Sequence, residues 1–315
     1  MKRLFLSLCI LGFGIASMAQ PNVMPIKKDV SLIVLGTAQD AGFPQIGCNK
    51  KCCEKRFEQH NFSEKIIALG VVDPVAQKKF LFEATPDMTV QAYMLNRYAD
   101  VGNKEMPDGI FLTHAHIGHY TGLMFLGREG AGANKVPVYA MPRLKKFLET
   151  NGPWDQLVKL KNIDIRELAN EVPQKVTENL TVTPILVPHR DEYSETVGFV
   201  IAGPNKKALF IPDIDKWEKW DKKLPEELSK VDYAFIDATF FDTKEVNPKY
   251  ISQIPHSYVV ESMDILKNVP ASEKGKVYFI HINHSNPLFD PKSPQTKEVL
   301  KNGFHIARIY DVFKL

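Results

Sequence analysis

Three histidines in the segment Thr113-His114-Ala115-His116-Ile117-Gly118-His119 carry the strongest chemical signal in the sequence. An apolar strand is predicted just before this segment and an apolar helix just after it. Because residues i and i+2 of a strand share a face, His114 and His116 can bind one metal ion, and His119, in the first helical turn, can reach an adjacent ion. The alternative is three solvent-facing histidines in a polar loop, and the apolar elements on both sides argue against it.

Three further ligand-type side chains each follow an apolar segment that is predicted to be a strand. They are His189 after residues 183–188, Asp213 after residues 208–212 and His281 after residues 277–280. Open α/β sheets build their sites at the carboxyl ends of strands. Each residue taken alone could be a capping carboxylate or a histidine bonded to backbone, and the position at a strand end makes each a candidate ligand. An imidazole-rich site with an open position suits Zn²⁺, which would lower the pKa of bound water toward about 7 and so supply hydroxide, and Mn²⁺ or iron is a second option.

The elements that must position these residues form two series along the chain. The first series predicts strands at residues 31–35, 66–72, 80–82, 110–112 and 136–139, and helices at 87–98 and 143–150. The second predicts strands at residues 180–187, 197–202, 208–211, 233–236, 277–280 and 306–309, and helices around 215–222, 257–267 and 294–302. Two sheet-rich halves with helices between them suit a four-layer αββα sandwich, an α/β fold formed as a single domain by residues 20–315, although other α/β arrangements fit the same pattern.

Residues 1–19 differ from the rest of the chain. Lys2 and Arg3 precede an apolar run at residues 4–15, and Ser17-Met18-Ala19 fits a small-x-small cleavage site. The sequence therefore predicts a signal peptide cleaved after Ala19 and a periplasmic or secreted protein. The alternative, a retained membrane anchor, is disfavoured because about 12 apolar residues are too few to span a bilayer.

Composition narrows the class of partner. The 315 residues are 44% hydrophobic and 24% charged, which suits an enzyme with a substantial core. Loss of Lys2 and Arg3 with the leader lowers the net charge from +3 to +1. Without a basic run we expect no nucleic acid partner, and without a second long apolar stretch no membrane contact after cleavage. A small-molecule substrate is expected, and the oligomeric state is not predicted.

The order of these ligand-type residues resembles that of the metallo-β-lactamase superfamily, whose members read HxHxDH where this chain reads HxHxGH. The resemblance implies that the first metal is held by His114, His116 and His189, that Asp213 bridges, and that His119 and His281 hold the second metal. The acidic residue expected at Gly118 would be a ligand of the second metal, so the second site should bind more weakly. Alternatively, glycine serves a tight turn with positive φ, or another residue, such as Asp40, supplies the carboxylate.

The segment Gly36-Thr37-Ala38-Gln39-Asp40-Ala41-Gly42-Phe43-Pro44-Gln45-Ile46-Gly47-Cys48 narrows the resemblance to one branch. It resembles the opening loop of the coenzyme PQQ synthesis protein B family and of the cyclic-ribose phosphodiesterases of phosphonate breakdown, both relatives of ribonuclease Z. Residues 122–140 and 279–287 extend the likeness, which covers most of residues 30–310. The PQQ family usually departs from the full histidine pair, which this chain keeps, and a secreted location argues against a role in PQQ synthesis.

Cys48, Cys52 and Cys53 form a second group, and they are the cysteines that remain after predicted cleavage. In the related phosphodiesterases, cysteines of this loop bind structural zinc together with a histidine three residues after the last catalytic one, which corresponds to His284. The resemblance thus implies a structural Zn²⁺ site, with His60 as a substitute ligand. A Cys48–Cys52 disulfide with a free third thiol is the alternative in an oxidising compartment.

His256 precedes a predicted helix, where ribonuclease Z-like phosphodiesterases carry a histidine that protonates the leaving group or stabilises phosphoryl oxygens. The leading prediction is a metal-dependent hydrolase, a phosphodiesterase of a small or cyclic phosphoester, with His256 and Asp213 as catalytic residues and Arg190, Tyr193 and Asp40 near the pocket. An ordinary loop histidine is the alternative for His256. The alternative for the whole chain is a PQQ synthesis protein B-like iron-dependent oxygenase or redox-cofactor-binding protein.

Overall fold

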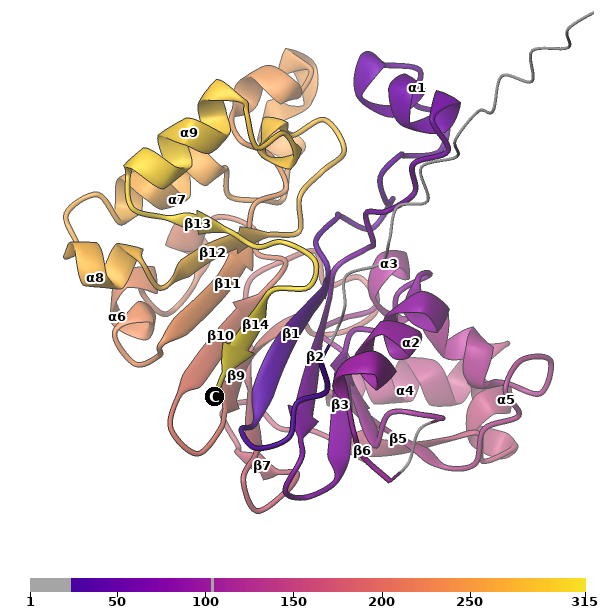
Figure 1. The fold of residues 1–315 in the computed structure, drawn as a ribbon. Coiled ribbons are helices and arrows are strands. Elements are labelled where there is room, and N and C mark those ends of the chain that lie inside the picture. Colours follow the sequence, from indigo (N-terminus) through magenta and orange to yellow (C-terminus); the bar gives the residue numbers. More distant parts are fainter. Residues whose placement is uncertain (1–23, 103–104) are drawn as a thin grey trace, which may run out of the picture.

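The structure, a computed structural model, describes residues 24–102 and 105–315. Two seven-stranded sheets in this part of the chain pack face to face, and helices cover both outer faces (Figure 1). We call residues 31–167 the first half and residues 174–306 the second half. The result is the predicted four-layer α/β sandwich. The predicted signal peptide lies outside the described residues.

Each half supplies most of one sheet. In spatial order the first sheet contains β14 (Val312–Lys314), β1 (Ser31–Gly36), β2 (Ala68–Asp73), β3 (Lys78–Phe82), β4 (Gly109–Phe111), β5 (Val136–Ala140) and β6 (Ile163–Glu167). The second contains β13 (His305–Ile306), β12 (Val277–Ile280), β11 (Tyr233–Asp237), β10 (Lys207–Ile211), β9 (Val197–Ala202), β8 (Thr181–Leu186) and β7 (Gln174–Lys175). Strands β3 to β6 run parallel, as do β10 to β13, so their carboxyl ends lie at the same edge of each sheet.

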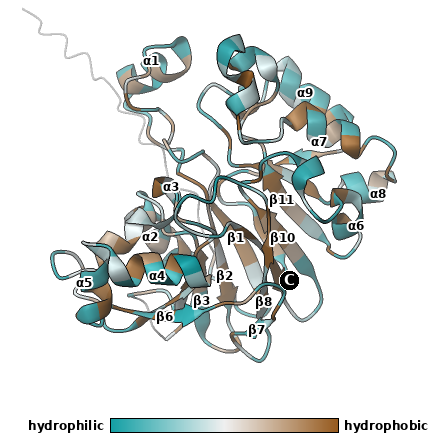
Figure 2. Ribbon diagram, turned by 180° about the vertical axis from the view of Figure 1, so that it is seen from behind, coloured by the Kyte–Doolittle hydropathy of each residue, from teal (hydrophilic) through white to brown (hydrophobic). Residues whose placement is uncertain are grey.

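Alternating side chains explain why these strands are buried on both faces. In β1, Leu32 and Val34 point into the core between the sheets, whereas Ile33 and Leu35 point into the core under the helices. The strands are accordingly mostly hydrophobic, and the helices are mixed (Figure 2). Because both faces are covered, the strands are continuous apolar runs, and this pattern made most of them predictable.

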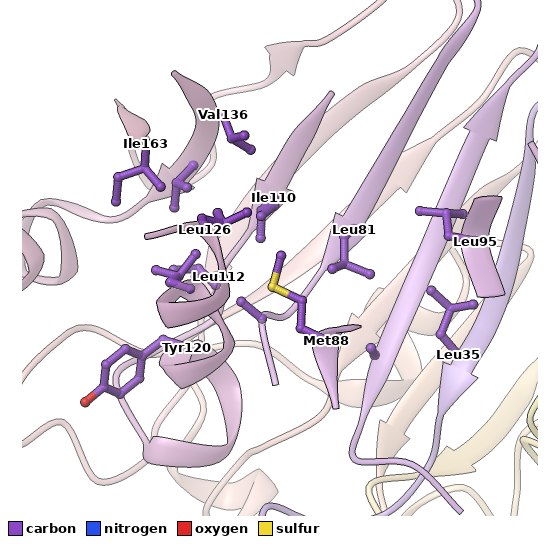
Figure 3. Close-up of a cluster of buried hydrophobic side chains, with 14 of the residues drawn as sticks. Leu35, Leu81, Met88, Leu95, Ile110, Leu112, Tyr120, Leu126, Val136 and Ile163 are labelled. Atoms are coloured by element: carbon purple, nitrogen blue, oxygen red, sulfur yellow. The ribbon is translucent and has the colours of Figure 1, made fainter. Parts of the chain in front are cut away.

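The first outer layer shows how the helices close the sandwich. Leu81 and Ile110 from the sheet pack with Met88, Leu95 and Leu126 in one apolar cluster (Figure 3). The helices and 3₁₀ turns of this half are α1 (Lys51–Glu58), α2 (Met88–Tyr98), α3 (Ile117–Tyr120), η1 (Thr121–Leu126), α4 (Pro142–Thr150) and α5 (Trp154–Lys159). Those of the second half are η2 (Trp217–Lys219), α6 (Leu224–Leu228), η3 (Thr243–Glu245), η4 (Pro248–Gln253), α7 (Val259–Ile265), α8 (Ala271–Lys274), η5 (Pro287–Phe289) and α9 (Pro294–Lys301).

Two predicted elements are wrong in extent. The helix expected around residues 215–222 is the single 3₁₀ turn η2, where the backbone N–H of Trp217 donates to Ser257 Oγ and the indole N–H donates to Ser262 Oγ. The strand expected at 306–309 is the two-residue β13, because the chain turns at Arg308 to begin its return to the first sheet as β14. No helix in the described ranges is long and apolar enough to cross a bilayer.

Candidate metal centre

The six predicted ligands converge where strand ends of the two sheets meet. His114 lies just beyond β4, and His116 and His119 lie at the start of α3. The remaining three follow strands of the second half: His189 after β8, Asp213 after β10 and His281 directly after β12. All the predicted ligands are therefore brought together, and their binding of metal stays a prediction.

The first group contains His114, His116 and His189. His114 Nε2 lies 2.8 Å from His116 Nδ1, and His189 Nε2 lies 3.3 Å from the same Nδ1 atom. Burial, together with the neighbouring histidines, holds the pKa of His114 well below its usual value, and burial lowers the pKa of His189 to about 2. Neutral imidazoles with free lone pairs facing one another are the state that a metal ion requires.

The second group contains His119, Asp213, His281 and an additional carboxylate, Asp40. Asp40 Oδ1 lies 3.0 Å from both His119 Nε2 and His281 Nε2, and Asp213 Oδ2 lies 3.2 and 3.4 Å from the same two nitrogens. The other oxygen of Asp213, Oδ1, lies 3.7 Å from His189 Nε2 in the first group. The carboxylate of Asp213 thus faces both groups, as a bridging ligand must.

The spacing of the donor atoms fits metal ions. Zinc–ligand bonds of about 2.0–2.1 Å in a tetrahedron place neighbouring ligand atoms roughly 3.3 Å apart. The four distances of the second group, 3.0 to 3.4 Å, lie close to that value. Asp213 Oδ2 is moreover buried without a hydrogen-bond donor, which is costly for a carboxylate unless a cation lies beside it. These residues therefore fit two metal ions.

A buried carboxylate and a threonine support His114 from behind in the first half. Thr113 Oγ1 lies 2.9 Å from His114 Nδ1 and donates to Glu83 Oε1 at 2.5 Å. Glu83 follows β3, has φ +76° and lies 3.4 Å from His119 Nδ1. Burial raises the pKa of Glu83. A side chain behind the ring in this way fixes which nitrogen faces the metal.

The same device recurs behind His281 in the second half. Thr239 Oγ1 lies 2.9 Å from His281 Nδ1 and donates to Asp237 Oδ1 at 2.7 Å. The other oxygen of Asp237 lies 2.7 Å from Nδ1 of His256, which is 8% exposed. Burial lowers the pKa of His256, but the Asp237 carboxylate, through its charge and its hydrogen bond, acts with Asp213 and Asp40 to raise that pKa overall. The structure therefore orients the predicted proton donor beside the metal ligands.

Sequence reasoning missed the residues of this outer shell. Besides Glu83 and Asp237, they include Glu192, whose carboxylate lies 3.0 Å from His116 Nε2, and Ser194, whose hydroxyl accepts the backbone N–H of Ala115. The available signal was position, because Glu83 and Asp237 stand at the ends of apolar strands, like the ligands themselves. The pocket candidates Arg190 and Tyr193 lie exposed on the same loop as Glu192.

The structure corrects the explanation that a positive φ requires glycine at position 118. Gly118 lies in α3 and is absent from the residues with positive φ. A Cβ atom at this position would lie 2.5 Å from the Cβ and 2.6 Å from the Cα of Asp40. Glycine is therefore needed because Asp40 occupies the adjacent volume.

The cysteine group lies apart from this centre, on the segment that includes α1. The sulfur atoms of Cys48, Cys52 and Cys53 and a ring nitrogen of His284 all lie within 4.8 Å of one another. The three thiols form no disulfide with one another, and Cys52 Sγ donates a hydrogen bond to Cys53 Sγ at 4.0 Å. His60, the substitute ligand, is exposed and outside the group. The arrangement matches the predicted four-ligand set.

Comparison with known proteins agrees with the fold. The family model described as "Beta-lactamase superfamily domain" matches residues 78–282, a segment that contains all six predicted ligands and leaves Asp40 outside. The chain is 26% identical to coenzyme PQQ synthesis protein B of Methylobacillus flagellatus over 311 residues, which cover 87% of this chain and 96% of that protein.

Two solved structures are similar in shape. Zn²⁺-bound PqqB from Methylobacterium extorquens superposes with a TM-score of 0.70 at 18% identity, over 90% of this chain and 100% of that one. A diphosphatase from the PhnP family superposes with a TM-score of 0.62 at 21% identity, over 91% and 97% of the two chains. At these identities the likeness shows a shared metallo-β-lactamase fold.

Proposed function

We propose that this chain, which belongs to the beta-lactamase superfamily, is a metal-dependent hydrolase. Its proposed substrate is a small phosphodiester or cyclic phosphoester. One observation carries the proposal: Asp213 faces two groups of metal-ligand side chains, and His256, oriented by a buried carboxylate, lies beside them. Two metal sites that share a carboxylate suit displacement at phosphorus. The solved neighbours include a diphosphatase, which supports phosphorus chemistry.

The residues have separate tasks in this proposal. Divalent metal held by the two groups would supply hydroxide near neutral pH and neutralise charge on the phosphoryl oxygens. His256 donates a proton to the leaving oxygen from Nε2, because its Nδ1 faces Asp237. Asp237 keeps that ring protonated and oriented. Glu83 and Thr113 hold His114 with Nε2 toward the metal.

We propose Zn²⁺ as the resident ion of the catalytic groups, with Mn²⁺ or iron as alternatives that the same donors accept. The solved neighbour that contains Zn²⁺ supports this choice. We also propose a structural Zn²⁺ at Cys48, Cys52, Cys53 and His284, since a set of three sulfurs and one imidazole is typical of closed zinc sites.

Metal analysis with a substrate panel tests the proposed function. Purified full-length protein should contain zinc or manganese and hydrolyse bis-p-nitrophenyl phosphate, and chelation should remove this activity. A cyclic phosphate and a β-lactam should be assayed in parallel to separate phosphoesterase from other hydrolase activity. Metal-loaded protein that hydrolyses none of the phosphoesters would contradict the proposal.

A second candidate function rests on the curated relatives, which are coenzyme PQQ synthesis proteins matched over nearly their full length. In this alternative the same histidines and carboxylates hold iron, and the protein acts as an oxygenase or binds a redox cofactor. Iron in the purified protein, with oxygen uptake and no phosphoester turnover, would favour it.

Location and partners are further parts of the proposal. We expect export, cleavage after Ala19, a small-molecule substrate, and no nucleic acid or membrane partner. N-terminal sequencing of protein recovered from a bacterial periplasm should begin at Gln20. A cytoplasmic product that begins at Met1 would contradict export.

A further inference from the structure

We propose that Asp40 is the carboxylate ligand of the second metal, in place of the acidic residue that the superfamily motif carries where this chain has Gly118. The proposal rests on the proposed function in that it takes the centre to hold two metals. It goes beyond the family match, which begins at residue 78 and assigns no role to Asp40.

The first argument is the position of the Asp40 carboxylate. Its Oδ1 lies 3.0 Å from Nε2 of both His119 and His281, so one oxygen completes a group whose other members are these rings and Asp213. The four donors come from both halves of the sandwich, Asp40 and His119 from the first and Asp213 and His281 from the second. A metal ion surrounded by these atoms would have the same mixed nitrogen and carboxylate set that the HxHxDH motif provides.

The second argument is charge. Two divalent ions roughly 3.5–4 Å apart repel each other strongly, so anionic ligands must offset their charge. Asp213 faces both groups and supplies one negative charge. The histidines His119 and His281 and the whole first group are neutral as ligands, so Asp40 supplies the second charge.

The third argument is steric exclusion between positions 40 and 118. Because a Cβ at residue 118 would lie 2.5 to 2.7 Å from three carbon atoms of Asp40, the two positions cannot both carry a carboxylate without movement of the backbone. The glycine in the motif and the aspartate in the opening loop therefore depend on each other.

The fourth argument is that the backbone of the opening loop is held in place. Gln39 N–H donates to the carbonyl of Ile282 at 2.9 Å, and Ile282 N–H donates to Thr37 at 2.7 Å. Ala38 forms bridges to both Ile66 and Ile282. The loop is thus attached to the residue after His281, which keeps Asp40 beside that ring.

Metal counting tests the proposal. Full-length wild type, Asp40→Asn and Asp40→Ala are dialysed, and bound Zn²⁺ or Mn²⁺ per chain is measured by elemental mass spectrometry. Both variants should lose one ion relative to wild type, or bind it more than about 100-fold more weakly, beyond the roughly 10–100-fold effect of losing an outer-shell partner. Asp191→Ala is the matched control, because this carboxylate accepts from Thr196 Oγ1 on the same rim and belongs to none of the ligand groups.

A steric test provides the second arm. Gly118→Ala should lower the melting temperature, because the added Cβ would lie 2.5 to 2.7 Å from three carbon atoms of Asp40, one of them the backbone Cα. Unchanged metal affinity in Asp40→Asn and Asp40→Ala would overturn the inference. The metal content is measured without substrate, so this test is independent of activity. If the wild type hydrolyses no phosphoester but Asp40→Asn still loses one ion, the proposed function is contradicted and this inference stands.

Discussion

The two halves of the sandwich support the metal centre with the same device. In the first half, Glu83 and Thr113 lie behind His114, and in the second half, Asp237 and Thr239 lie behind His281. Both carboxylates are fully buried and follow or end a strand. The repetition shows how a sheet edge can hold an imidazole rigidly: one strand provides the ring and its neighbour provides the buried acceptor.

The difference between the halves lies in charge. Burial raises the pKa of Glu83. Asp237 is buried as deeply, but its pKa is lowered, because the charge and hydrogen bond of His256, together with His281 and Thr239, outweigh the effect of burial. In the proposed function, the first half would hold metal, and the second half would hold metal and also deliver a proton from His256.

Backbone strain is present on both sides of the centre. Glu83 has φ +76° and His281 has φ +62°, a region that costs a non-glycine residue roughly 1–3 kcal/mol. The two residues differ in role, since Glu83 supports a ligand and His281 is predicted to be one. Strain at such positions persists only where the surrounding contacts determine it, as the paired strands do here.

The largest expected effect tests the role shared by both halves. His116→Ala should lower phosphoesterase activity at least about 1000-fold and remove metal, because it deletes a ligand, whereas loss of an outer-shell partner costs roughly 10–100-fold. The far-ultraviolet circular dichroism spectrum should be unchanged, since His116 is not a core residue. A folded His116→Ala protein with wild-type activity would refute the metal-hydrolase proposal.

His256→Ala tests what belongs to the second half alone. Activity should fall about 10²–10⁴-fold, the usual contribution of general acid–base catalysis, while the metal content stays at the wild-type value. A substrate whose leaving group needs no proton, such as a p-nitrophenyl ester, should lose less activity than an alkyl phosphodiester. Equal losses on both substrates would mean that His256 acts by another route.

The pH dependence of kcat/KM should distinguish the role of Asp237 from that of Glu83. The pKa of His256 is raised, so kcat/KM should fall as pH rises through that value and the acid loses its proton. Asp237→Asn removes the largest of the charges that raise the pKa of His256, so the pH at which kcat/KM falls should decrease.

Glu83→Gln is the matched control in the first half. This variant should lower metal affinity or activity roughly 10–100-fold, and the pH at which kcat/KM falls should stay unchanged. An equal shift of the pH profile in Glu83→Gln would abolish the distinction between the halves.

The sequence predicted the ligands better than their supports, for a physical reason. His114, His189, Asp213 and His281 each lie within three residues of the end of an apolar strand, so local pattern placed them at the sheet edge. Glu83 reaches Thr113 only because β3 pairs with β4 in a register that sets Phe82 beside Phe111. Such cross-strand registers depend on tertiary pairing, which a single sequence does not reveal.

The elements of the fold were predictable where local sequence pattern determines them, and not where tertiary contacts do. Most strands and the α/β sandwich were predictable from continuous apolar runs, whereas η2 and β13 depend on contacts with distant residues. Asp40 follows no periodic pattern, and its place beside His281 comes from the bridge between Ala38 and Ile282. The sequence left open whether Gly118 means a missing ligand or whether Asp40 supplies the carboxylate, because the contact between the two residues is tertiary.

The smallest expected effect concerns the candidate zinc group formed by the three cysteines and His284, which joins the halves away from the sheet edges. Cys48, Cys52 and Cys53 belong to the first half and His284 to the second, and Phe43 packs on Phe289 beside them at a ring distance of 4.6 Å. A zinc ion held by this group would connect α1 to the second half without involving any predicted catalytic ligand. His284→Ala should therefore release one zinc ion. It should also lower the melting temperature by a few degrees, about 2–4 °C for each kcal/mol of stability lost.

Hydrolysis by His284→Ala should stay within about twofold of wild type, because the ligands at the sheet edges are untouched. His60→Ala is the control, since that exposed histidine of the first half lies outside the group and should change neither zinc content nor stability. If His284→Ala lost activity in proportion to the zinc that it lost, the cysteine group and α1 would also determine the geometry of the catalytic centre. In that case the two halves would be coupled through the cysteine group as well as through Asp213.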